Sequence, residues 1–494
     1  MKLLLGALAA LCLASLAVGL DNPYVRVHPW TALFLLSAAC LARVILRRRS
    51  EGRALFDEPA HAPLLLVALT AYLATFRWHG GDDIPNSILP FALLRHGTLS
   101  MEPFRRLFLV EQSLRDFVVV TSQPLMSVFS IVPGLLALPV ALPAVLAGAR
   151  PEDLLLHNLS KVSGSLICAA SVPVVYEMVR GRASHSWAVT MALFYGLGTW
   201  TFSVSSQALH SHGPAQLGVA LGLLGMLREP RSIAPYLSGF GFALATTCRE
   251  DSVFFLAAAA LFYLFHRRER LPRFCAGAMA PLALNAAYWL YYTGRLRPPY
   301  MGVQGGLFGA FQWEALFAML ASPTRGLFLF VPAAVFGIWG MKRACLDPRR
   351  RWAPYLIGAC FATLVFYCFR SSWTGGQTFG TRYFAAVCIV LALFCGEIEA
   401  EIAGSGRAKV LWTAAFSVSI LVHSVGAFFT YPGSYAIVEQ TAELWEWSLH
   451  PLLNLFRADG PLFKLSTVPR AFLASALLML TVPLAFLNHR FLSK

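Results

Sequence analysis

Apolar runs recur from one end of the chain to the other, and short polar stretches separate them. A helix needs about 20 mainly apolar residues to cross a membrane. Runs that approach or reach this length lie at 2–20, 29–46, 62–76, 160–179, 184–203, 213–227, 232–248, 252–266, 273–292, 324–341, 352–369, 383–400, 409–428 and 468–487. The pattern therefore predicts an all-α polytopic membrane protein with about 14 transmembrane helices.

The apolar stretch 124–147 is harder to assign, because three prolines interrupt it and leave both a span and a re-entrant segment open. Whether 1–20 is cleaved as a signal peptide is also left open. We expect one integral membrane domain. Its expected parts are an N-terminal helical hairpin at 1–61, a first large external loop with juxtamembrane or re-entrant helices at 77–159, a transmembrane core at 160–428, an external amphipathic loop at 429–467, and a last helix with a cytoplasmic tail at 468–494.

Composition and charge fit this picture. Only 13% of the residues are charged, against about 25% in soluble domains. The basic clusters between the predicted spans, beginning with Arg47-Arg48-Arg49, fall on one side when the spans alternate, and the positive-inside rule makes that side cytoplasmic. Both termini are then cytoplasmic and 77–159 is external. The net charge of +15 is accounted for in part by these loops, so it does not indicate nucleic-acid binding.

Two adjacent carboxylates, Asp82 and Asp83, follow two glycines at the predicted external membrane surface. A carboxylate beside a low-dielectric wall tends to have a raised pKa and can act as a general base on a hydroxyl. We take Asp82 as the catalytic candidate. For Asp83, a helix cap or a supporting partner of Asp82 is the alternative.

Other external loops carry residues that suit a sugar or a phosphate. Each has an ordinary alternative, such as an interfacial histidine, a tryptophan of the aromatic belt or an arginine that snorkels to headgroups. The candidates are Gln207, His210, His212, Arg325, Trp373, Gln377 and Arg382. The ten cysteines contain no CxxC pair and predict no zinc site. A divalent cation near Asp82 is left open, and no cofactor is certain.

Several short motifs follow one another in a fixed order, and the ordered set resembles the polytopic GT-C glycosyltransferases. This clan includes protein O-mannosyltransferases and lipid A aminoarabinose transferases, and the likeness is greatest to its large bacterial members. The motifs are Gly81-Asp82-x-x-Pro85, Leu89-Pro90, Leu93-Leu94-x-x-Gly97, Pro133-Gly134-Leu135-Leu136-Ala137-Leu138-Pro139, Ser206-Gln207-Ala208, His212-Gly213-Pro214, Ser322-Pro323-Thr324-Arg325-Gly326, Trp373-x-Gly375-Gly376-x-x-Phe379-Gly380-x-Arg382-Tyr383 and Trp445-Glu446-Trp447-Ser448.

The resemblance implies transfer of a sugar, with inversion, from a polyprenyl-phosphate donor to an acceptor glycan, lipid or protein. It places the protein in the bacterial inner membrane with the site facing the periplasm. Asp82 would deprotonate the acceptor, and loop arginines would stabilise the departing lipid phosphate. One departure stands out. Relatives often carry a lysine before the Pro-Gly helix, and the stretch 129–134 here has none. Either another cation, Arg325 or Arg382, replaces it, or the activity differs from that of the relatives.

Two other functions fit a chain of this kind. One is a transporter or flippase of a lipid-linked or anionic solute, and the other is an O-antigen polymerase or ligase. A transporter needs ionisable groups near the middle of its spans. Here the predicted span interiors are nearly free of charge, while acids and arginines gather in external loops, which favours chemistry at one face.

Overall fold

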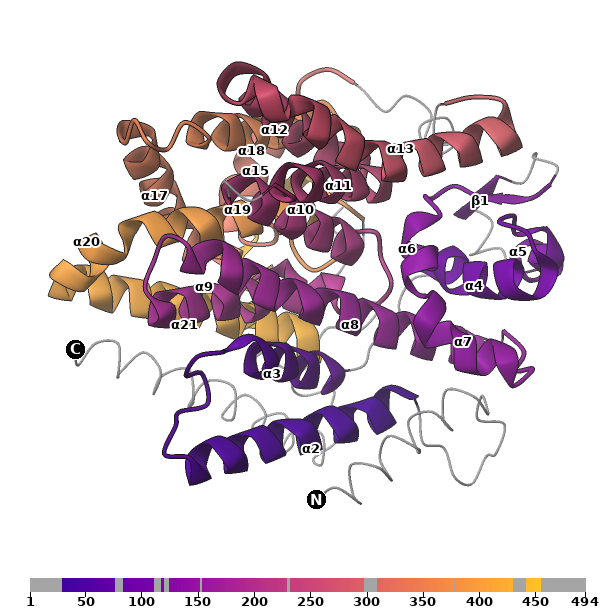
Figure 1. Cartoon of the computed structure of the whole chain (residues 1–494), viewed down its shortest axis with the longest axis horizontal. Coiled ribbons are helices and arrows are strands. Elements are labelled where there is room, and N and C mark those ends of the chain that lie inside the picture. The colour runs from indigo at the N-terminus through magenta and orange to yellow at the C-terminus, as the bar shows by residue number, and fades with distance from the viewer. Residues whose placement is uncertain are drawn as a thin grey trace.

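The computed structural model describes residues 29–75, 83–110, 117–119, 124–151, 153–228, 232–296, 309–376, 378–429 and 441–454. Helices dominate this part of the chain (Figure 1). Its first half contains α2 (Pro29–Ser50), α3 (His61–Leu73), α4 (Ile84–His96), α5 (Arg105–Val110), α6 (Val132–Leu136), α7 (Leu138–Leu146), α8 (Asp153–Arg180), α9 (His185–Leu197), α10 (His212–Leu227) and α11 (Ala234–Cys248).

The second half continues in the same way. It contains α12 (Val253–His266), α13 (Leu271–Thr293), α15 (Trp313–Ala321), α16 (Leu327–Phe330), α17 (Ala334–Leu346), α18 (Ala353–Cys368), α19 (Ala385–Cys395), α20 (Glu399–Gly404), α21 (Gly406–Phe429), α22 (Thr441–Leu444) and α23 (Pro451–Asn454). Short 3₁₀ turns lie at η1 (Glu102–Phe104), η4 (Glu250–Ser252), η5 (Arg268–Arg270), η6 (Arg382–Phe384), η7 (Gly396–Ile398) and η8 (Trp447–Leu449), and η3 (Thr201–Ser205) is a π-helix. Two-residue strands β1 (Val118–Val119) and β2 (Met126–Ser127) pair antiparallel.

The predicted all-α class agrees with this architecture, apart from the one small strand pair. Within the described ranges, four helices are long and apolar enough to cross a membrane: Trp30–Ser50, Leu155–Arg180, Arg382–Gly404 and Gly406–Phe428. His61–Leu73 and Ala353–Cys368 are shorter apolar helices. The expected runs 2–20 and 468–487 lie outside the described residues.

Prolines explain two differences from the predicted runs. The run 324–341 is not one helix, because α16 ends at Phe330 and α17 begins only after Pro332, whose nitrogen cannot donate a helical hydrogen bond. The stretch 124–147 is divided into β2, α6 and α7, and each of these two helices has a proline in its first turn. It is therefore not one continuous transmembrane helix.

Helix α8 is the central element of the bundle. It packs against α3, α9 and α10, and α10 in turn packs against α11, which packs against α13. In Figure 1 the group of α4 to α7 with β1 lies at the right-hand end of the molecule, while α17 and α20 lie at the left-hand end. This right-hand group has its own hydrophobic core, which includes Phe91 and Phe108 and extends to Trp289 of α13.

A single carboxylate ties the turn before α5 to the strand region. Glu102 accepts two hydrogen bonds of 2.8 Å from Arg105 and one of 2.7 Å from the backbone N–H of Leu125. The bond from Arg105, followed by that from Leu125, lowers the pKa of Glu102 from 4.5 to about 2. This carboxylate therefore remains ionised at all but very acidic pH.

We predict that Glu102→Gln loosens the segment around 124–128 at neutral pH, because the amide holds the Leu125 N–H and Arg105 less strongly. The folded pKa lies below the unfolded value of 4.5, so the contribution of Glu102 is complete above about pH 4.5 and is lost as the pH falls towards 2. Hydrogen exchange at Leu125 and its neighbours measures this. Equal exchange in both proteins at pH 7 would contradict it.

Candidate functional site

Asp83 is fully buried immediately before α4. It occupies the N-cap position of α4, but its side chain makes no bond to the helix N–H groups. Instead Oδ2 accepts a hydrogen bond from the Ser160 hydroxyl of α8, and Ser160 Oγ accepts a bond of 2.8 Å from the Leu209 backbone N–H. Asp83 Oδ1 has no hydrogen-bond partner among the described residues. Asp83 is therefore held by α8 and by the turn before α10.

Lys161, the next residue of α8, is 1% exposed and lies in a buried polar cluster. Its ammonium donates to Gln207 Oε1 at 3.0 Å and to the Ser206 carbonyl at 3.3 Å. Thr75, which follows α3, also donates to Gln207 Oε1, at 3.0 Å. The candidate Gln207 thus accepts from Lys161 and Thr75, and its amide nitrogen is bound to the Phe202 carbonyl at 2.8 Å.

Glycine at position 164 allows this arrangement. A Cβ added to Gly164 would lie 2.3 Å from the Ala208 carbonyl oxygen, which is far inside van der Waals contact. Only glycine lets α8 approach the turn after η3 so closely. This approach brings Ser160 and Lys161 of α8 against the segment 206–209.

A second polar cluster surrounds Arg249, which lies between α11 and η4. Its guanidinium pairs with Asp251 at 3.2 Å, donates to the Tyr367 hydroxyl at 2.8 Å and lies 3.1 Å from His212 Nε2. The Tyr367 hydroxyl donates to Asp251 at 2.7 Å. The rings of Tyr367 and Tyr383 stack with centroids 3.9 Å apart, and Arg249 lies over Tyr383.

Arg325 is 3% exposed and holds the loop that precedes α19. Its guanidinium donates to the carbonyls of Thr374, Gly376 at 3.0 Å and Gly380 at 3.3 Å. Among the described residues it forms no ion pair, and its buried Nε has no hydrogen-bond partner there. A guanidinium keeps its charge at every physiological pH. Arg325 is thus a buried cation without a carboxylate in the described part of the chain.

The two clusters meet at the turn before α10. His212 is within electrostatic range of His210, Arg249 and Arg382, and Arg382 is within range of Arg325. The turn 206–212 also carries Gln207, which contacts Lys161. Three cationic side chains, Lys161, Arg249 and Arg382, therefore lie near one turn, and Arg325 lies near Arg382.

The predicted site residues fall into three groups. Asp82 and Gln377 lie outside the described residues, and their roles remain predictions. Gln207, His210 and His212 lie in the turn, Arg382 lies near His212, and Arg325 lies near Arg382. Trp373 lies in the same loop as Arg382, but its ring is buried in the main hydrophobic core.

Sequence reasoning gave no role in the site to Ser160 or Lys161. The run 160–179 reads as an apolar span with a polar end, and a lysine there is ordinarily a snorkelling residue. A signal was available, since Lys161 is separated from Asp83 only by the first large loop and lies on the same predicted side.

The described side chains offer few ligands for a metal ion. No group of three or more histidine, cysteine, aspartate or glutamate side chains that could hold a metal ion is found among them. Asp83 Oδ1, which has no hydrogen-bond partner in the described part of the chain, is an oxygen of the kind that hard divalent cations bind. A cation near Asp82 therefore remains a prediction.

Comparison with known proteins gives distant likenesses only. No family model matches the chain, and no curated protein matches it. The crystal structure of the Archaeoglobus fulgidus oligosaccharyltransferase tethered with an acceptor peptide is 12% identical, with a TM-score of 0.43, and the match covers 89% of this chain and 56% of that one. The archaeal oligosaccharyltransferase AglB from Archaeoglobus fulgidus, in complex with an inhibitory peptide and a dolichol-phosphate, is 13% identical with a TM-score of 0.42 and the same coverage. The chain spans about half the length of these structures, and likenesses of this size show neither a family nor an activity.

We predict that Arg325→Gln opens the loop 374–380, because three carbonyls lose a buried cationic donor. Hydrogen bonds to charged groups contribute about 1.5–3 kcal/mol each, so the free energy of unfolding should fall by at least about 2 kcal/mol. Hydrogen exchange in 374–384 and thermal unfolding measure the effect. Arg349→Gln, at a side chain that is 89% exposed, is the control. An Arg325 variant as stable as this control would contradict the prediction.

Proposed function

We propose that the chain is a membrane glycosyltransferase of the GT-C type. It transfers a sugar from a polyprenyl-phosphate donor to an acceptor hydroxyl at the external face, which is the periplasmic face of a bacterial inner membrane. The observation that carries this proposal is the buried guanidinium of Arg325, which has an unpartnered Nε and no ion pair among the described residues. A buried cation in this state suits an anionic ligand, and the guanidinium fork matches the oxygens of a phosphate or a carboxylate.

The surrounding charges support a lipid phosphate as that ligand. Arg382 lies near both Arg325 and His212. Arg249 also lies near His212, and its charge is paired with the carboxylate of Asp251. Lys161 adds a cation on the side of Asp83. It is the third candidate, beside Arg325 and Arg382, for the lysine that relatives carry before the Pro-Gly helix.

In the proposed reaction Asp82 takes the proton of the acceptor hydroxyl as its oxygen attacks the anomeric carbon. The new carbon–oxygen bond forms on the face opposite the phosphate, the bond from that carbon to the phosphate oxygen breaks, and the polyprenyl phosphate leaves with the electron pair. Arginines near the phosphate stabilise the charge that grows on it. Asp83, fixed by Ser160, positions the neighbouring Asp82.

A divalent cation beside Asp82 is compatible with this proposal. Asp82 and the free oxygen of Asp83 would hold it. When bound, such a cation neutralises charge on the donor phosphate.

We predict that Asp82→Asn reduces transfer by at least about 100-fold, the usual size of a general-base contribution. In the native host, a polyprenyl-phosphate sugar should accumulate while an external glycan, lipid or protein lacks one sugar. Glu269→Gln, an exposed carboxylate in the basic cluster on the other side, is the matched control and should leave both profiles unchanged. Unchanged glycan and lipid profiles in Asp82→Asn, at normal protein level, would refute the assignment. Altered solute uptake with an intact glycan would favour the transporter.

The proposed orientation has its own test in intact cells. A cysteine at His96, which is exposed at the end of α4, should react with a membrane-impermeant maleimide. A cysteine at Arg349, between α17 and α18, should react only after the membrane is permeabilised. The unsubstituted chain, with its exposed Cys275 and Cys345, sets the background. Labelling of both positions in intact cells would contradict the topology.

A further inference from the structure

A pocket of about 390 Å³ lies at the other end of α8, away from Asp83. Its walls come from the loop between α2 and α3, the last turn of α8 and the residue after α10, and they are made by Glu58, Pro59, His61, Tyr176, Glu177, Arg180, Gly181 and Arg228. Ser160 and Tyr176 are 16 positions apart on α8, which is about 24 Å at 1.5 Å per residue. The pocket is therefore separate from the candidate active site.

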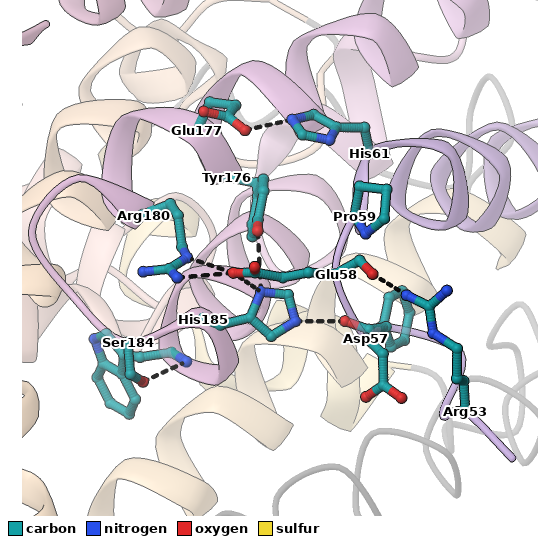
Figure 2. Close-up of polar contacts among 12 residues, drawn as sticks. Arg53, Asp57, Glu58, Pro59, His61, Tyr176, Glu177, Arg180, Ser184 and His185 are labelled. Carbon is teal, nitrogen blue, oxygen red and sulfur yellow. Dashed lines mark hydrogen bonds and ion pairs between the residues drawn. The ribbon is translucent and has the colours of Figure 1, made fainter.

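The charged side chains of the pocket include two ion pairs, and Figure 2 shows the first of them, between Glu58 and Arg180. Glu58 pairs with Arg180 at 2.7 Å, and the hydrogen bond from Arg180 lowers the pKa of Glu58. Glu177 pairs with Arg228 and also contacts His61. A ligand with a single charge would be attracted by one member of each pair and repelled by the other. A ligand that carries one positive and one negative group can match both.

These pairs are accessible enough to exchange partners. The side chains of Glu58 and Arg180 are 54% and 40% exposed, and those of Glu177 and Arg228 are 22% and 37% exposed. Exposed ion pairs contribute only about 0–1 kcal/mol each. A ligand that replaces one partner of each pair therefore loses little of the existing stabilisation.

The wall formed by the loop 54–59 is held in place independently of these pairs. The Arg48 guanidinium donates to the carbonyls of Ala54, Leu55, Asp57 and Pro59, at distances that include 2.9 Å to Leu55 and 2.6 Å to Pro59. His185 Nε2 lies 2.5 Å from the Phe56 carbonyl. A wall fixed in this way does not have to be ordered when a ligand binds, which favours affinity.

The position of the pocket indicates where such a ligand comes from. Both α2 and α8 are candidate membrane spans, and both end at this side in arginines. Ends of spans lie at the depth of lipid headgroups. We propose that this pocket binds a phosphoethanolamine group, with its phosphate on Arg180 and Arg228 and its ammonium on Glu58 and Glu177. The group is the headgroup of phosphatidylethanolamine or a soluble phosphoethanolamine ester.

The test is thermal unfolding of the purified full-length protein in detergent, with three added probes. Dihexanoyl phosphatidylethanolamine should raise Tm in a saturable way. Dihexanoyl phosphatidylcholine should raise it by less than half as much, because its trimethylammonium has no N–H to donate to the carboxylates. If soluble phosphoethanolamine raises Tm as much as the short-chain lipid does, the source is the soluble ester. If it has a much smaller effect, the source is the lipid.

Variants assign the response to the pocket. Glu177→Gln and Arg228→Gln should each abolish the difference between the two lipids. The matched control is Arg343→Gln, which breaks an ion pair of 2.8 Å with Glu401 on the same predicted side and should keep the full difference. Equal shifts with both lipids in the unsubstituted protein would overturn the proposal even if a variant fails to fold. A lipid difference that survives both pocket variants would overturn it as well. None of these outcomes depends on the transferase proposal.

Discussion

The close approach of α8 to the turn before α10 is the constraint on which the candidate site depends. At Gly164 there is no room for a side chain, because the Ala208 carbonyl lies where a Cβ would be. This contact places Ser160 and Lys161 against the segment 206–209, and Ser160 in turn holds Asp83. A larger residue at position 164 would separate the carboxylate side of the site from the turn that carries Gln207 and His212. Backbone proximity within the bundle, more than any single polar contact, thus assembles the site.

The low dielectric of the bundle makes the pairing of its buried charges important for stability. A buried charge is costly unless it is paired or hydrogen-bonded. Arg249 meets this requirement with Asp251 and Tyr367, whereas Arg325 has carbonyl partners and no ion pair in the described part of the chain. At the other end of α8, Glu58 pairs with Arg180 and Glu177 pairs with Arg228. The two ends therefore suit different ligands, an anion at the first and a zwitterion at the second.

Much of this architecture could be predicted from the sequence, because apolar runs and basic clusters report membrane insertion and side directly. The helical class, α2, α8, α19 and α21 follow from these patterns. Whether a proline ends a helix or only bends it was harder to foresee. From the sequence, α16 and α17 were therefore expected as one span, although the helix breaks at Pro332. The contacts of Asp83 with Ser160, and of Arg325 with the loop 374–380, join residues far apart in the chain. Neither hydrophobic periodicity nor motif spacing carries that information.

The central claim is that the cations around Arg325 receive the phosphate of a lipid donor beside Asp82. A cryo-EM structure of the full-length protein with a polyprenyl phosphate tests this most directly. The phosphate oxygens should lie within hydrogen-bond reach of Arg325 Nε or Arg382. The isoprenoid chain should leave the phosphate towards the membrane, and Asp82 should lie on the side of the phosphate opposite to this chain. Density for the phosphate at mid-membrane depth, or at the Arg180 end of α8, would contradict the claim.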